Sequence, residues 1–281
     1  MHAFHPGPFA TDTAFTARTT EARRWSLARF VPIAEIELKG FLQTKSGLVG
    51  DLLVGPIVWF ALFAAGIGGT IGVASGGGGD AHAYLTFVLP GFLVLQGFGG
   101  FTRMIYRTTI DRKWGLLAMK RLLGAGGLGY VLALMTVPVL SFLAKAAAIT
   151  AVAIPMGVRV TPGPYVLAIA LTGVLLSFWT ALAILLTALV RTYQQRDILL
   201  GIIVLPMTFA APVFYPLDAA PAYVRAIALL NPLSYQVMAV RRVFEGQNPG
   251  WWLVGALAAT VIAVIAAVVS VTRGELLGQQ G

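Results

Sequence analysis

The 281-residue chain is 58% hydrophobic and 11% charged, with a mean hydropathy of +0.82. Soluble domains carry about 25% charged residues to face water, so this composition excludes an ordinary soluble fold. The absence of cysteine excludes disulfides, cysteine-ligated metals and cysteine nucleophiles. The net charge of +9 comes from bases in short segments between apolar runs, which indicates membrane topology and no nucleic-acid partner.

Six apolar runs are long enough to cross a membrane, which takes about 20 residues. We expect an all-α, polytopic membrane protein, because a backbone in lipid must satisfy its own hydrogen bonds. The expected transmembrane domain covers 32–273, between cytoplasmic tails at 1–31 and 274–281. Its expected spans are 50–70, 84–102, 128–152, 164–190, 198–215 and 251–272.

Lysines and arginines alternate in density between these runs. The segment before the first span and the 103–127 loop are rich in them, whereas the 71–83 loop has none. The positive-inside rule therefore predicts that both termini are cytoplasmic, and an even number of spans agrees with this. We expect a multi-pass protein of the cytoplasmic (plasma) membrane.

Residues 32–45 are amphipathic and too polar to span. Pro32 suits the first turn of a helix. Ala34, Leu38, Phe41 and Leu42 share one helical face, and the adjoining face holds Glu35, Lys39 and Gln43. We expect an interface helix at the cytoplasmic surface, with an ordinary juxtamembrane anchor as the alternative.

The 211–250 segment is too rich in proline to span, yet it is strongly apolar between its prolines. We expect short re-entrant helices that dip into the outer leaflet before the last span. Irregular backbone at that depth must be buried in protein or line a cavity.

The sequence lacks the motifs that are typical of nucleotide binding, metal binding and proton transfer. The dipeptide Gly-Lys never occurs, so the chain has no Walker A loop to bind ATP phosphates. The histidines lie outside every expected span, and no carboxylate pair lies within one. We expect no catalytic, cofactor-binding or metal-binding residue and no proton relay of an ion-coupled carrier.

Lys145 is the ionisable residue furthest inside an expected span. An intramembrane charge is a functional candidate, for contact with an anionic substrate or another subunit. From its position past the middle of the helix, the side chain could instead snorkel to the outer interface. The sequence leaves both alternatives open.

The 212–243 segment reads PVFYPLDAAPAYVRAIALLNPLSYQVMAVRRV. It resembles the signature of the ABC-2-type transporter permeases, with a proline–aromatic turn, an Asn-Pro-Leu-Ser-Tyr run and then Arg241. The residues that carry this re-entrant motif are Pro212, Phe214, Tyr215, Pro216, Asn231, Pro232 and Tyr235. The expected spans and interface helix extend the resemblance over most of the chain.

The resemblance implies the transmembrane permease of an ABC exporter. Its partners would be a separate ABC ATPase, which would bind ATP and Mg, and a second copy (a homodimer) or a homologous permease. The interface helix and the 103–127 loop would contact the ATPase. Candidate coupling residues are Glu35, Lys39, Asp111, Arg112, Lys113 and Trp114, although Trp114 could instead lie among lipid headgroups.

Exporters of this family move drugs, lipids or lipid-linked glycans. The 43–48 segment lacks the basic run of the polysaccharide branch, which favours drug or lipid export. An amphipathic substrate suits a path lined by Trp59, Phe63, Phe98, Lys145, Met207 and Phe209, although packing or lipid contact is the alternative for each aromatic residue. The rival functions are a non-transporting assembly or scaffold protein and a polysaccharide-branch permease.

Overall fold

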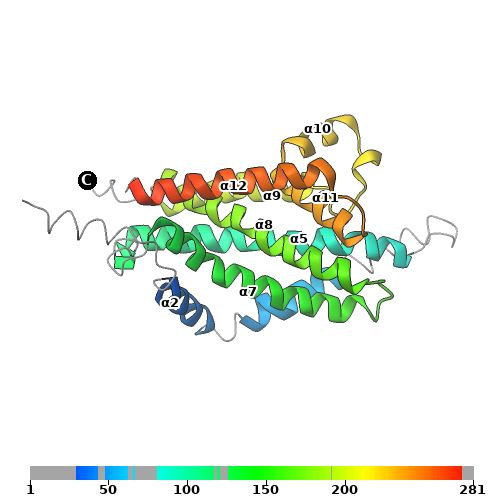
Figure 1. Ribbon diagram of the computed structural model, residues 1–281, viewed down its shortest axis with the longest axis horizontal. Coiled ribbons are helices and arrows are strands. Elements are labelled where there is room, and N and C mark those ends of the chain that lie inside the picture. Colours follow the sequence, from blue (N-terminus) through cyan, green and yellow to red (C-terminus); the bar gives the residue numbers. More distant parts are fainter. Residues whose placement is uncertain are drawn as a thin grey trace, which may run out of the picture.

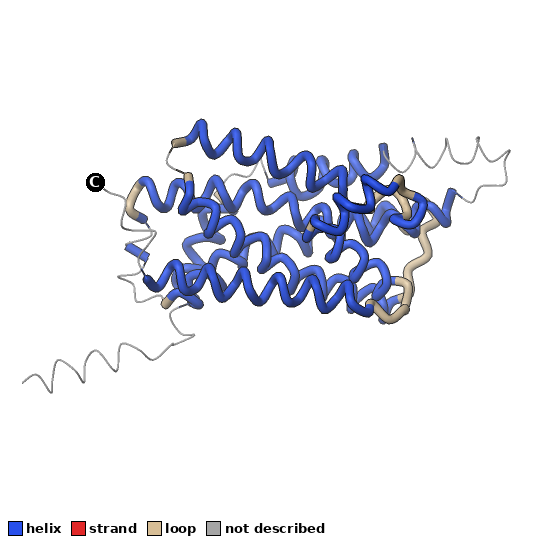
Figure 2. The backbone as a smooth tube through the Cα atoms, turned by 90° about the horizontal axis from the view of Figure 1, so that it is seen from above, coloured by secondary structure: helices blue, strands red, loops and turns tan. Residues whose placement is uncertain are grey.

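The computed structural model describes residues 30–43, 48–62, 66, 81–116, 119–120, 126–190 and 192–273. Within these ranges every regular element is a helix, which confirms the predicted class. Phe63, nearly all of the expected N-terminal tail and the whole of the C-terminal tail lie outside the described residues. Figures 1 and 2 show the longest helices side by side in one bundle.

The elements follow one another in a simple order. They are α2 (Phe30–Leu42), a π-helical turn η2 (Gly50–Val54) that continues as helix to Leu62, α5 (Ala81–Lys113), α7 (Gly127–Ala153), α8 (Pro162–Leu189), α9 (Tyr193–Ala210), a 3₁₀ turn η3 (Leu217–Ala219), α10 (Ala222–Leu230), α11 (Pro232–Phe244) and α12 (Gly250–Arg273).

In the part of the chain that the structure describes, four helices are long and apolar enough to cross a membrane: α5, α7, α8 and α12. The last three agree with the predicted spans 128–152, 164–190 and 251–272 to within a few residues. The Gly50–Leu62 helix is apolar but shorter, and most of the remainder of the expected 50–70 span lies outside the described residues. The chain is therefore a multi-pass membrane protein.

Two predicted boundaries were wrong. α5 continues to Lys113, so the first part of the expected 103–127 loop is helix. α9 ends at Ala210, five residues before the expected end of the 198–215 span. The chain stays apolar after Ala210, but Pro212 and Pro216 cannot donate helical hydrogen bonds.

α9 also begins differently from an apolar span. Thr192 accepts a hydrogen bond of 3.1 Å from the backbone N–H of Gln195, whose side chain accepts in return from the Thr192 backbone. This capping box starts the helix in a polar segment, before its apolar part. The apolar part alone is shorter than the length that a membrane span needs.

The core is centred on α8, which packs against α5, α7, α11 and α12. Buried aromatic side chains join α8 to α5. The rings of Phe98 and Trp179 meet edge to face with centroids 4.5 Å apart, a geometry that contributes about 1 kcal/mol beyond burial. Trp179 Nε1 donates a hydrogen bond of 2.8 Å to Gln236 Oε1, which links this core to α11.

The bundle has two distinct ends, which we name the α2 end and the α10 end. α2 lies beside α7 at the first, where α5, α8 and α12 finish; α10 and α11 lie at the second (Figure 1). Between the ends, the outward faces carry exposed large apolar side chains, such as Val166 of α8, Ile202 of α9 and Ile262 of α12. Such surfaces suit contact with lipid or another membrane subunit.

Candidate functional site

Four charged side chains form a cluster at the α2 end: Glu37 from α2, Arg107 and Asp111 from α5, and Lys120. We call it the α2-end cluster. Arg107 Nε and Nη2 donate to Glu37 Oε2 and Oε1 at 2.8 and 3.0 Å, a two-pronged pairing that fixes orientation. Lys120 Nζ donates to Glu37 Oε1 at 2.6 Å and also bonds Asp111.

The α2-end cluster is buried and electrically balanced. Glu37, Asp111 and Lys120 are buried, and two carboxylates face two cations. Burial raises the pKa of Glu37, but hydrogen bonds and charge from Arg107 and Lys120 outweigh it and hold that pKa below its ordinary value. The ionised cluster therefore fastens α2 to α5.

The candidate coupling residues fall into different environments. Glu35 and Lys39 form an exposed ion pair on α2, 2.6 Å apart. Asp111 is fully buried in the α2-end cluster, where its carboxylate pairs with Lys120. The Asp111 carboxylate faces inward because helix α5 continues past residue 102 and orients it toward Lys120.

The residues that follow Asp111 lie nearer the surface. Arg112 Nη1 donates a hydrogen bond of 2.5 Å to the carbonyl oxygen of Thr187 at the end of α8. Lys113 Nζ lies 3.6 Å from the centroid of the Tyr193 ring. Trp114 is 74% exposed, so its ring is accessible at the α2 end of the bundle.

Sequence reasoning missed Glu37, Arg107 and Lys120. The spacing of Arg107 and Asp111 by four residues was an available signal, because such residues are neighbours on a helix. It went unused because the segment was expected to be a loop. Nothing local pairs Glu37 with Lys120, which lies 83 residues later.

A second charged cluster lies farther from the α2 end. It consists of Asp51, Arg103 and Lys145, and we call it the Asp51 triad. Lys145 Nζ of α7 donates to Asp51 Oδ1 at 3.2 Å, and Arg103 of α5 bonds Asp51 Oδ2. The Arg103 guanidinium also lies 5.0 Å from the ring centroid of Phe41 on α2. Lys145 is only 7% exposed, which contradicts the snorkelling alternative: its ammonium reaches an acid on another helix instead of the outer interface.

At the α10 end, Arg241 of α11 donates hydrogen bonds to backbone carbonyl groups of the turn that follows α9 and of α5. Its Nη2 donates to the carbonyl oxygens of Pro212 at 2.7 Å and Val213 at 3.0 Å, and its Nε donates to that of Phe87 at 3.3 Å. Buried carbonyl groups without donors would be costly. Arg241 therefore makes the irregular turn after Ala210 tolerable.

Asn231 supports the same turn from the junction of α10 and α11. Its Nδ2 donates to the Met207 carbonyl oxygen at 2.8 Å, and its Oδ1 accepts from the Leu233 backbone N–H at 3.0 Å. Pro232 occupies the first turn of α11, where its missing N–H costs nothing. This asparagine–proline pair both caps α11 and ties it to α9.

Tyrosine hydroxyls complete the arrangement. Tyr84 donates to the Phe214 carbonyl oxygen at 3.2 Å, Tyr215 to that of Ala210 at 2.9 Å, and Tyr235 to that of Leu229 at 2.9 Å. Most polar side chains of the predicted re-entrant motif thus act on backbone carbonyl groups. The motif serves to hold a broken helix and two short ones together.

The candidate path residues do not share one environment. Phe98 is buried in the core against Trp179. Trp59 and Phe209 are exposed on the outward surface, Met207 is partly buried, and Phe63 lies outside the described residues.

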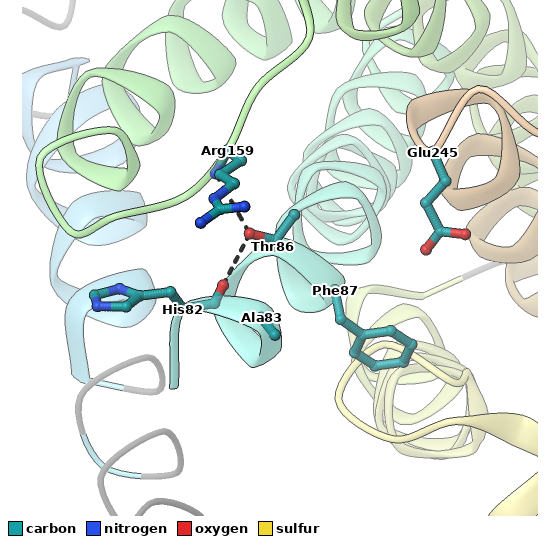
Figure 3. Close-up of a pocket in the computed structure, with 6 residues that line it drawn as sticks. All are labelled: His82, Ala83, Thr86, Phe87, Arg159 and Glu245. Carbon is teal, nitrogen blue, oxygen red and sulfur yellow. Dashed lines mark hydrogen bonds between the residues drawn. The ribbon is translucent and has the colours of Figure 1, made fainter. Parts of the chain in front are cut away.

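An open pocket of about 290 Å³ lies at the α10 end. Figure 3 shows its lining, in which Thr86 lies between His82 and Arg159, with Glu245 on the far side. Thr86 Oγ1 donates to the His82 carbonyl oxygen at 2.8 Å and accepts from the Arg159 backbone N–H at 3.4 Å. The second of these hydrogen bonds connects the start of α5 with the segment between α7 and α8. Among the described residues, no group of histidine and carboxylate side chains could hold a metal ion.

Comparison with known proteins identifies the family. Residues 33–244 match the sequence profile of the ABC-2 type transporters, so the chain belongs to that family. The matched range runs from α2 to the end of α11 and contains both charged clusters and the re-entrant motif. The family resemblance inferred from 212–243 is confirmed.

The ycf38 protein of Cyanophora paradoxa, whose name describes it provisionally as a transport permease, is 27% identical over 175 residues. The match covers 60% of this chain and 58% of that relative, which is less than two thirds of the relative's length.

Proposed function

We propose that this chain is the membrane-embedded permease of an ATP-driven exporter. It works with a separate nucleotide-binding ATPase, which holds ATP and Mg, and with a second copy of itself or a homologous permease. The observation that carries this proposal is the α2-end cluster, because it joins the two segments expected to meet an ATPase, α2 and the end of α5. No Walker A loop lies within this sequence, which supports a nucleotide-binding site supplied from outside it.

The α2 end faces the cytoplasm in this proposal, in agreement with the positive-inside rule. Closure of the ATPase subunits on ATP pushes α2 and the segment that follows α5. Since Glu37 binds both Arg107 and Lys120, displacement of α2 is transmitted to α5 as a unit. Exposed Trp114 offers the ATPase one large apolar anchor at the same end.

The substrate is an amphipathic molecule, such as a drug, a lipid or a lipid-linked glycan, that leaves across the cytoplasmic membrane. The exposed apolar rings of Trp59 and Phe209 are available to line its path between two permease copies. The Asp51 triad adds charge close to this apolar surface. A non-transporting scaffold has no evident use for intramembrane charges beside such a surface, which favours transport.

Reconstitution tests the proposal. The chain is purified with its co-expressed ATPase, placed in liposomes of anionic and zwitterionic lipid, and supplied with ATP. We expect ATP-dependent movement of a fluorescent lipid between leaflets or of a drug into the lumen, and no movement when the ATPase carries a Walker A lysine substitution. An ATPase complex that hydrolyses ATP but moves neither probe class would favour the scaffold function.

A further inference from the structure

We propose that the Asp51 triad binds the phosphate headgroup of an anionic amphiphile. Arg103 and Lys145 would hold the phosphate, and the exposed apolar face of the Gly50–Leu62 helix would carry the chain. This site is defined by the permease alone and does not require an ATPase partner. Three observations support it: an excess of positive charge, an open side and an adjoining apolar track.

The charge of the triad is unbalanced. Two cations share one carboxylate, with Lys145 on Oδ1 of Asp51 and Arg103 on Oδ2. Among the described residues, Asp51 is the hydrogen-bond partner of both. The neighbouring α2-end cluster cannot supply a second anion, because its two acids already face two cations.

The triad lies between the two ends of the bundle, along the part of α5 and α7 that would cross the membrane, where unbalanced charge is costly. Arg103 precedes the end of α5 at Lys113 by ten residues, about 15 Å along the helix axis. Lys145 precedes the end of α7 at Ala153 by eight residues, about 12 Å from that end. Ionisable groups at such depth pair with an opposite charge. A bound anion would complete the pairing.

The triad is closed on one side and open on the other. The Lys145 side chain is 9% exposed, whereas those of Asp51 and Arg103 are 36% and 39% exposed. A ligand can therefore approach past Asp51 and Arg103 and end at the Lys145 ammonium. Guanidinium and ammonium groups carry five and three N–H donors, so one bond each to Asp51 leaves donors for phosphate oxygens.

The apolar track distinguishes an amphiphile from a free anion. Val54 follows Asp51 by three residues, and Val58 and Leu62 follow Val54 at four-residue intervals, which places the three along one side of their helix; all three are exposed. An acyl chain lying on them would have its headgroup at the triad. A π-helical turn at Gly50–Val54 also marks this start of the helix, and such turns are common at functional sites.

Calorimetric titration of the detergent-purified chain tests the site, with short-chain phosphatidic acid as the probe. Short-chain phosphatidylcholine and inorganic phosphate are the comparison ligands. We expect phosphatidic acid to bind more tightly than either, and Lys145→Met to weaken it about tenfold, the loss of one charge-assisted hydrogen bond. Asp51→Asn should instead tighten binding, because it removes the carboxylate that competes with the phosphate.

Two further variants serve as controls for Lys145→Met. Lys145→Met leaves the Asp51–Arg103 pair intact and should fold; Lys145→Arg should retain binding if the cation itself matters. Arg225→Gln removes an exposed cation at the α10 end and should leave affinity unchanged. Unchanged affinity in both Lys145→Met and Asp51→Asn would overturn the proposal, as would equal binding of phosphatidylcholine. Equal binding of inorganic phosphate would overturn the amphiphile and identify a free anion as the ligand.

Discussion

Glu37 on α2 accepts a hydrogen bond of 2.6 Å from Lys120, which lies 83 residues later in the chain and beyond the end of α5. Both side chains are buried, and Arg107 joins them through the same carboxylate. Through this contact α2 packs against the bundle and is not an isolated helix.

Removing the Glu37 charge should loosen α2. Glu37→Gln leaves Lys120 and Arg107 with Asp111 as their remaining acid, and breaking a buried ion pair costs about 3–5 kcal/mol. We expect lower thermal stability in detergent and faster amide hydrogen exchange across α2. Glu35→Gln, two residues away in an exposed pair, is the matched control and should change neither.

A double variant separates charge balance from general damage. Glu37→Gln combined with Lys120→Met removes one charge of each sign and leaves the Arg107–Asp111 pair. It should recover part of the stability lost in Glu37→Gln alone. A loss of stability in the double variant equal to the sum of the losses in the two single variants would show that Glu37 and Lys120 do not form a stabilising ion pair.

The lowered pKa of Glu37 predicts a response to acid. A carboxyl whose pKa is lowered on folding stabilises the fold above its ordinary pKa of about 4.3, and this stabilisation is lost as pH falls through the lowered value. We expect protection of α2, corrected for intrinsic exchange, to be constant from about pH 7 to pH 5 and to decline below about pH 4. Persistence of this acid transition in Glu37→Gln would show that another group causes it.

Arg241 should be essential for the fold at the α10 end. Arg241→Gln withdraws donors from the carbonyl groups of Pro212, Val213 and Phe87, and each unsatisfied buried group costs about 1–3 kcal/mol. Arg241→Lys should rescue little, because an ammonium lacks the planar fork that reaches several acceptors. Thermal unfolding of both variants checks this, with Arg242→Gln, its less buried neighbour, as the control that should unfold like the parent.

Exposed Trp114 should matter for coupling and not for folding. In the purified permease–ATPase complex, Trp114→Ala should lower substrate-stimulated ATP hydrolysis and transport together, since truncating an aromatic anchor costs about 2 kcal/mol or more of interface energy. Membrane insertion and thermal stability of the chain should stay unchanged. A photo-crosslinker at position 114 that captures lipid alone, and never the ATPase, would assign Trp114 to the headgroup region.

Spans whose apolar runs are continuous could be predicted from the sequence. α7, α8 and α12 begin and end close to the expected residues because lipid demands one uninterrupted apolar stretch. The end of α5 could not be predicted in this way, since Arg107 and Asp111 look like loop residues until their charges are paired. The prediction of where α9 ends was wrong for the opposite reason: Val213 and Phe214 are apolar, as residues of a span are, but they lie outside the helix.

The candidate site was less predictable than the fold. The family signature marked Asn231, Tyr235 and Arg241, but their action on backbone carbonyl groups depends on where α9 breaks. The pairs that join distant segments, such as Asp51 with Lys145, are set by tertiary packing and leave no local pattern. Local periodicity predicts faces of helices, and only the packed bundle determines which charges meet.

The proposed pairing of permease and ATPase can be tested by measuring ATP hydrolysis by the purified chain alone and by its complex with the co-expressed ATPase. We expect no hydrolysis by the chain alone and robust hydrolysis by the complex. We also expect Glu37→Gln and Trp114→Ala to lower substrate stimulation of the complex, whereas Glu35→Gln should not. Hydrolysis by the chain alone, retained after removal of every ATPase subunit, would contradict the proposed function.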